Sequence, residues 1–256
     1  MNIFVFDIET VPDIELAKKI YDLNNLGQHD VIQALFAMQR EKNGSEFLPH
    51  FLQKVISISM VWAKNSKIKI FSLGNEQSDE SELISKFFNA IDKYTPTLVS
   101  WNGSGFDLPV LHYRSLINKI SAPTYWEHGE QNQNFKWNNY LSRYHYRHLD
   151  LMDVLAGYQP KCYAPLSEIA ISLGFPGKMG MSGAQVLDYY LAGDLSSIRN
   201  YCETDVINTY CVYLRFELMR GKILLNDYET LIANLKDYLI TDPSKQHFNE
   251  FALAIT

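Results

Sequence analysis

The sequence has few cysteines and no long apolar run. Only three of its 256 residues are cysteines, and they form no CxxC pair. A sparse, odd set argues against a disulfide framework and suits a reducing compartment, so we expect a cytoplasmic protein. No run approaches the ~20 apolar residues that span a bilayer, and the first residues resemble a strand rather than a signal peptide. We therefore expect neither export nor a membrane partner.

The sequence also lacks an excess of positive charge. Its 23 basic and 29 acidic residues give a formal net charge of -6. A module that coats nucleic acid through a basic surface is usually positive, so the balance counts against that class. It does not count against an enzyme whose divalent cations bring positive charge to the phosphate. With 46% apolar residues and no linker or repeat, the chain is expected to form a single domain over residues 1–256.

The order of expected elements indicates an α/β protein with a mixed sheet flanked by helices. The first three strands are joined compactly, which favours antiparallel pairing, whereas the later strands are separated by helices, which favours parallel pairing. The expected strands cover residues 2–7, 54–62, 67–73, 97–101 and 148–152, with a turn at Asn65-Ser66. The expected helices cover residues 79–94, a segment from 107, and 165–173, 183–191, 194–220 and 225–239, so that a helical C-terminal part spans about 165–240, and residues 13–50 form a helical insertion.

Two acids close the first strand, in the sequence Asp7-Ile-Glu9-Thr10. Successive side chains of a strand alternate between faces, so both carboxylates point the same way. Neighbouring carboxylates repel and are unfavourable near a core unless a cation lies between them. Hard oxygen ligands suit Mg²⁺ or Mn²⁺. Taken alone, the tetrapeptide fits equally well a strand that ends in solvated acids.

A third acid, Asp107, follows a strand and the glycine-rich turn from Asn102 to Phe106. This order places Asp107 at the carboxyl end of the sheet, where α/β sheets collect ligands. An aspartate here is also a good helix N-cap, which is the ordinary interpretation of Asp107 alone. Asn102 fits a substrate contact or an Asx turn, and Phe106 fits the core or a stacking surface for a base.

Tyr201 and Asp205 lie four residues apart in an expected helix, so they share a face. One of them can hold a metal ion while the other contacts a water on it. On its own the pair fits an exposed aspartate beside a half-buried tyrosine. The order of the three segments is more specific: a strand with two acids, then a strand, turn and acid, then a helical tyrosine and acid.

The three segments together resemble the DEDD superfamily of 3′–5′ exonucleases, in the branch with tyrosine in the third motif. More closely, the chain resembles predicted 3′–5′ exonucleases related to the proofreading domain of family B DNA polymerases. The first, second and third motifs match residues 6–10, 99–109 and 201–205, and residues 148–153 and 176–180 also resemble that group. The resemblance covers most of the chain and is weakest over residues 13–50 and the C-terminal end.

This resemblance implies an RNase H-like fold with a mixed five-stranded sheet, three antiparallel strands followed by parallel ones. It implies two divalent metal ions, Mg²⁺ or Mn²⁺, about 4 Å apart. Asp7, Glu9 and Asp205 would hold one ion, and Asp7 and Asp107 the other. Tyr201 would orient the attacking water, since a phenol with a pKa near ~10 is a poor base at neutral pH.

The implied substrate is the 3′ end of single-stranded DNA, released as nucleoside 5′-monophosphates in proofreading or repair. Thr10, Asn102 and Phe106 are the implied contacts of the terminal nucleotide. A separate polymerase or repair protein is an implied partner. Two alternatives stay open: an exoribonuclease acting on short RNA, and a non-catalytic nucleic-acid-binding module on the same fold.

Two further segments fit a path for the substrate strand. Residues 136–148 combine Lys136, Arg143 and Arg147 with four aromatic rings and contain no acid. Such a mixture suits a single strand, and it suits equally an aromatic loop packed on the core. Lys178, in a glycine-rich loop, fits a phosphate contact or an ordinary solvated lysine.

Overall fold

Five strands form one mixed sheet in the order β3-β2-β1-β4-β5. The computed structural model describes residues 2–65 and 67–255. Its strands are β1 (Asn2–Pro12), β2 (Gln53–Lys64), β3 (Lys67–Ser72), β4 (Thr97–Ser100) and β5 (His148–Asp150). β1, β2 and β3 pair antiparallel, and β4 and β5 continue the sheet in parallel. The mixed sheet expected from the sequence is confirmed.

The first strand is longer than the expected residues 2–7. Its pairing with β2 continues from Asn2 opposite Lys64 to Pro12 opposite Gln53. The two acids of the first motif therefore lie inside the strand, because the pairing with β2 continues past Glu9 to Pro12. A register shift follows Glu9, which marks a β-bulge next to the acids. Of the expected turn, Asn65 has φ of 55°, and Ser66 lies outside the described residues.

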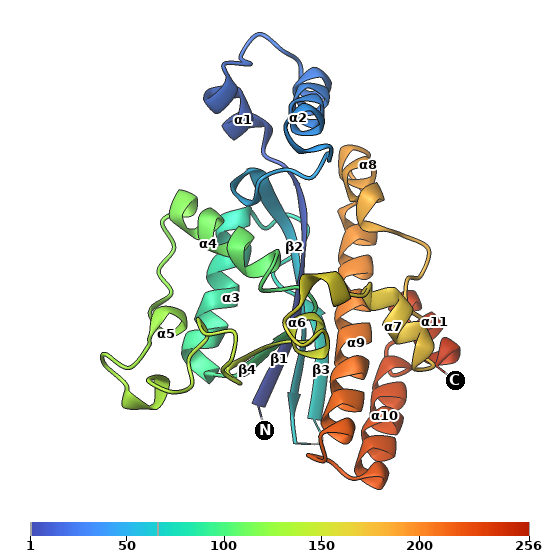
Figure 1. The fold of residues 1–256 in the computed structure, drawn as a ribbon. Coiled ribbons are helices and arrows are strands. Elements are labelled where there is room, and N and C mark those ends of the chain that lie inside the picture. The colour runs from blue at the N-terminus through green and yellow to red at the C-terminus, as the bar shows by residue number, and fades with distance from the viewer. Residues whose placement is uncertain (1, 66, 256) are drawn as a thin grey trace.

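Helices cover both faces of the sheet (Figure 1). On one face Phe4, Phe6 and Ile8 of β1 pack against α3 (Glu80–Tyr94) and α4 (Asp107–Asn118). On the other face Ile3 and Val5 pack against α9 (Leu195–Met219), α10 (Leu225–Leu239) and α11 (Gln246–Ala254). The β1 side chains at even positions thus face α3 and α4, and those at odd positions face α9.

The remaining elements lie around this three-layered centre. Between β1 and β2, the chain forms α1 (Ile14–Tyr21), α2 (Gln28–Asn43) and a 3₁₀ turn, η1 (His50–Leu52), and α1 and α2 project beyond the end of the sheet (Figure 1). The other short elements are α5 (Pro123–Trp126), η2 (Gln133–Phe135), α6 (Leu151–Leu155), η3 (Pro160–Cys162), α7 (Leu166–Ser172), η4 (Gly183–Gln185) and α8 (Val186–Leu191).

The helical boundaries agree with their local signals. Asp79 caps α3 by accepting a hydrogen bond from the Glu82 N–H at 2.8 Å. The helices α7, α9 and α10 fall within one residue of the expected ranges, and the expected helix 183–191 is divided into η4 and α8. Helix α11 was not expected. None of the helices formed by residues 2–65 and 67–255 is long and apolar enough to cross a membrane.

Candidate active site

The acids of the first motif face α9. Asp7 and Glu9 continue the row of odd positions that begins with Ile3 and Val5 and whose next member, Val11, packs with Tyr201 of α9. Asp7 is half-buried and Glu9 is buried. Because the row runs from the core into this end of the sheet, both carboxylates lie in an environment of low polarity.

The third acid reaches the same place from the opposite layer. Asp107 begins α4, but Phe106 is the N-cap residue and no side-chain capping bond is present. The N-cap interpretation of Asp107 is therefore wrong. Its Oδ1 instead accepts a hydrogen bond from the backbone N–H of Ile8 at 3.2 Å, and the side chain is buried. The residue that begins α4 is thus tied to the residue between the two acids of β1.

Helix α9 contributes the last two predicted residues. Tyr201 is buried and Asp205 is half-buried, so the interpretation of Asp205 as an exposed surface acid is also wrong. The two side chains share a hydrogen bond. Between them in sequence, the Cys202 thiol lies 3.5 Å from the Asp7 carbonyl oxygen and 3.6 Å from Asp7 Oδ2. This face of α9 is therefore in direct contact with β1.

Burial and mutual repulsion make ionisation of the four acids unfavourable. Burial, followed by the charges of the neighbouring acids, raises the pKa of Asp7 and of Glu9 well above the usual range. Burial raises the pKa of Asp107 to about 7 and that of Asp205 to about 6. Carboxylates gathered in this way ionise together only when cations offset their charge.

The donor set fits hard divalent cations. Oxygen atoms of Asp7 and Glu9 and the sulfur of Cys202 lie within 4.8 Å of one another. Burial, and then the charges of Asp7 and Glu9, raise the pKa of Cys202 well above its usual range, and its soft sulfur is a donor that Mg²⁺ and Mn²⁺ do not favour. The available donors are carboxylate oxygens, the ligands that Mg²⁺ and Mn²⁺ prefer.

Lys178, for which the sequence fitted either a phosphate contact or a solvated lysine, interacts electrostatically with this cluster. The positive charge of Lys178 opposes the raised pKa of both Glu9 and Asp205, although burial is the larger influence on each. The preceding residue, Gly177, is held to α9 by Asn208, whose amide accepts from the Gly177 N–H at 3.1 Å and donates to the Gly177 carbonyl at 2.8 Å. Gly177 has φ of 67°, and a Cβ there would lie 2.9 Å from a backbone oxygen. The loop is therefore fixed to the face of α9 that carries Tyr201 and Asp205.

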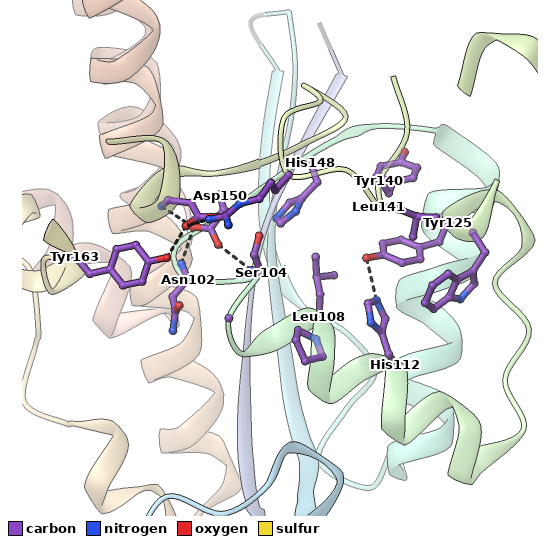
Figure 2. A pocket seen from close by; sticks show the side chains of 15 residues that line it. Asn102, Ser104, Leu108, His112, Tyr125, Tyr140, Leu141, His148, Asp150 and Tyr163 are labelled. Atoms are coloured by element: carbon purple, nitrogen blue, oxygen red, sulfur yellow. Dashed lines mark hydrogen bonds and ion pairs between the residues drawn. The ribbon is translucent and has the colours of Figure 1, made fainter. Parts of the chain in front are cut away.

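The turn of the second motif is supported by an acid that was not predicted as a site residue. Asp150, at the end of β5, accepts hydrogen bonds from the N–H groups of Asn102 at 2.9 Å and Ser104 at 2.8 Å (Figure 2). Asn102 has φ of 65°, a conformation that these bonds support. Gly103 is required there, because a Cβ would lie 2.2 Å from Ser100 Oγ.

A cavity of about 600 Å³ lies on the β5 side of this turn. Figure 2 shows Asp150 and Tyr163 at one end and Tyr125 and His112 at the other. Of the described residues that line it, none is one of the four acids of the cluster. Asn102 lines the cavity, whereas Asp107 points to β1. The cavity is therefore adjacent to the acid cluster without containing it.

Two of the implied nucleotide contacts, Thr10 and Phe106, adjoin Glu9 and Asp107 in sequence. The Thr10 hydroxyl donates to Gln53 Oε1 at 2.9 Å, and Phe106 is half-buried against the α3 and α4 face. The basic loop of residues 136–148 is largely engaged elsewhere. Arg143 pairs with Asp153 at 2.7 Å, and the Arg147 guanidinium lies 4.1 Å from the Phe135 ring. The core-packing interpretation fits Arg147 and the buried Tyr140, whereas Arg143, Trp137, Tyr144 and Tyr146 are exposed.

Most of this chain matches the model of one protein family. Residues 45–255 match the model of a family described as a predicted 3′–5′ exonuclease related to the exonuclease domain of family B DNA polymerases. The chain belongs to this family. The match omits β1, α1 and α2, so Asp107, Tyr201 and Asp205 lie inside it and Asp7 and Glu9 lie outside. No curated protein matches the chain.

Solved structures of two proteins align with this chain. The family B DNA polymerase of the hyperthermophilic archaeon Pyrobaculum calidifontis aligns with 100% of this chain at 14% identity and a TM-score of 0.51. The chain spans 27% of that polymerase. Exonuclease I of E. coli, solved in complex with a dA16 oligonucleotide, aligns with 96% of this chain and 44% of its own at 13% identity and a TM-score of 0.36. The polymerase comparison supports the RNase H-like fold.

Proposed function

We propose that this chain is a 3′–5′ exonuclease that uses two divalent metal ions, Mg²⁺ or Mn²⁺, and releases nucleoside 5′-monophosphates from single-stranded DNA in proofreading or repair. Membership of the family supports a 3′–5′ exonuclease acting on nucleic acid. The finer proposal rests on the buried acid cluster, whose members raise one another's pKa and have only carboxylate oxygens to offer. The relation to a DNA polymerase domain favours DNA over RNA.

In this proposal Asp7, Glu9 and Asp205 hold one ion, and Asp7 and Asp107 hold the second. The ions, when bound, would supply an acidified water and offset the charge that develops on the phosphate. Binding requires ionised carboxylates, so Asp107 and Asp205 would release protons as the ions bind. The hydrogen bond from Ile8 keeps the Asp107 carboxylate oriented toward β1 before any ion arrives.

Tyr201 has the role of orienting the attacking water. Burial, and then the charges of Asp205, Glu9 and Asp7, raise the pKa of Tyr201 well above its usual value. The phenol therefore keeps its proton at neutral pH and cannot act as a general base. The phenol donates its proton to the Asp205 carboxylate, so its oxygen is left to accept a hydrogen bond from the attacking water. Positioning of this kind supports catalysis by limiting the orientations of the nucleophile.

The test is digestion of 5′-labelled single strands of DNA and RNA of one sequence, in Mg²⁺ and in Mn²⁺. We expect a ladder that shortens from the 3′ end of DNA and is absent with Asp7→Asn or Asp205→Asn. Asp237→Asn, a substitution on the exposed side of α10, is the matched control. Full activity of Asp7→Asn would overturn the mechanism, and digestion of RNA alone would overturn the choice of DNA.

A further inference from the structure

Three aromatic rings meet beside Asp107, where the chain leaves the insertion and approaches β2. The ring centroids of Phe47 and Phe106 are 5.5 Å apart, those of His50 and Phe106 6.0 Å, and those of Phe47 and His50 6.1 Å. We call these three residues the aromatic shelf. The Phe47 side chain is 54% exposed, although it lies against two other rings. An apolar ring is thus presented to solvent next to the acid cluster.

The aromatic shelf is joined to the motifs on both sides. His50 Nε2 lies 3.0 Å from the Gly105 carbonyl oxygen and donates to it, because a carbonyl only accepts. On the other side, the Gln53 amide donates to the Leu48 carbonyl at 3.2 Å and accepts from the Thr10 hydroxyl at 2.9 Å. The segment that carries Phe47 therefore lies between the residue after Glu9 and the turn before Asp107.

A buried arginine holds this segment in place. Arg114 of α4, with a side chain 3% exposed, pairs with Asp13 at 2.7 Å and with Glu80 at 2.6 Å. Its Nη1 also donates to the Phe51 carbonyl at 3.0 Å. Asp13 and Phe51 stand at the two ends of the insertion, so both ends are attached to the helix that Asp107 begins. A ring mounted on a fixed support is suited to recognition, since little ordering is needed on binding.

We infer that the aromatic shelf stacks the base of the 3′-terminal nucleotide, with Phe47 supplying the accessible ring. This inference rests on the proposed function and names the part of the substrate that the insertion contacts. The occupant is a nucleobase, because every base has a π-face that stacks on an aromatic side chain without regard to sequence. Phe106 directly precedes Asp107, so a base on the shelf leaves its phosphate beside the acids. Phe47 and His50 extend a contact that the sequence assigned to Phe106 alone.

The experiment compares an oligonucleotide that ends in a normal 3′ thymidine with one whose 3′-terminal sugar lacks a base. Binding is measured in Ca²⁺ and turnover in Mg²⁺, for the wild type, Phe47→Ala and Phe47→Trp. We expect Phe47→Ala to weaken binding of the normal end by about 5- to 150-fold, the range for loss of one stacked base. The same variant should bind the baseless end as the wild type does. Phe47→Trp should retain the preference for a base.

Tyr113→Ala, which removes an exposed ring from α4, is the control and should leave binding of both oligonucleotide ends unaffected. Equal losses on both ends with Phe47→Ala, or no loss on either, would overturn the inference. If Phe47→Ala instead loses its effect on binding when the base at the penultimate position is missing, the assignment to the terminal nucleotide is overturned. Selective binding without turnover in Mg²⁺ would support the aromatic shelf and contradict the proposed exonuclease, so the two failures are distinguishable.

Discussion

The Asp107 carboxylate accepts a hydrogen bond from the backbone N–H of Ile8 at 3.2 Å, and Ile8 lies between Asp7 and Glu9. The layers on the two faces of the sheet are thereby joined at the acid cluster. Burial and the charges of Asp107 and Asp205 raise the pKa of both β1 acids. The cluster is therefore assembled before metal binds, in a form that favours protonated carboxyls.

In the metal-free protein, stability should fall as the pH rises. Burial raises the pKa of Asp107 to about 7, whereas an unfolded aspartate titrates near ~3.9. The folded state then holds more protons between these values, so the stabilisation is complete below about pH 4 and is lost as the pH rises through about 7. For Asp107 the difference is on the order of 2–4 kcal/mol. Calorimetry in EDTA from pH 5 to 8 should show a decline in Tm that Asp107→Asn reduces.

Asp237→Asn is the control for this series, because it removes an exposed acid outside the cluster. Addition of Mn²⁺ at pH 8 should restore the Tm of the wild type, since the ions offset the charge of the ionised carboxylates. A decline in Tm that is the same in Asp107→Asn and the wild type would contradict this assignment of the titration.

Tyr201→Phe should lower kcat by about 10- to 100-fold, the effect of a misplaced nucleophile. Affinity for Mn²⁺ should change little, because the carboxylates are the ligands and the phenol is not. Single-turnover digestion and a Mn²⁺ titration measure the two quantities. Tyr210→Phe, which removes another buried hydroxyl from α9, should leave both unchanged. An unaltered rate with Tyr201→Phe would remove Tyr201 from the mechanism.

Lys178→Gln should shift the acid limb of the pH–rate profile to higher pH. Burial raises the pKa of Glu9 and Asp205, and the Lys178 charge lowers both. Without that charge the carboxylates ionise at higher pH, so metal binding and kcat/KM recover later. We expect kcat/KM of the variant to be roughly 10-fold lower than that of the wild type near pH 6, and the difference to be smaller at pH 8.5. Lys161→Gln, in the exposed η3 turn, serves as the reference, and a loss of equal size at both pH values would exclude this electrostatic role.

Periodicity in the sequence predicted which faces carry the acids. The period of two placed Asp7 and Glu9 on one side of a strand, and the helical period placed Tyr201 and Asp205 on one side of α9. These are local relations, and the structure has both. The pattern of elements likewise predicted the mixed sheet.

Periodicity could not predict which residues from distant parts of the sequence come into contact in the fold. The bond from Ile8 to Asp107 joins residues 99 apart in sequence, and that from Gly177 to Asn208 joins residues 31 apart. No local pattern distinguishes Asp107 as a partner of β1 from Asp107 as an N-cap. Phe47 was missed for the same reason, because its neighbour Phe106 is distant in sequence. Asp150 lies within residues 148–153, a segment that resembles the family. Its role in supporting the turn follows only from its hydrogen bonds with Asn102 and Ser104, which are distant in sequence.

The basic loop offers a last prediction, because composition there suggested two opposite outcomes. Arg147 stacks on Phe135 and donates to the Asn138 carbonyl at 2.6 Å, and Arg143 pairs with buried Asp153. Arg143 Nη2 and Arg147 Nε are thus bonded within the fold. We therefore expect Arg143→Ala with Arg147→Ala to lower stability by about 1–3 kcal/mol through lost stacking and charged hydrogen bonds.

The salt dependence of single-strand binding should meanwhile stay the same in this double variant. Each phosphate contact that is lost reduces the slope of log K against log salt by about 0.7 for a single strand. Anisotropy titrations over a series of salt concentrations measure this slope, and urea unfolding measures the stability. Lys136→Ala in the same loop, an exposed cation, is the comparison. A slope reduced by one or two such steps, with unchanged stability, would place the two arginines on the substrate strand instead of in the fold.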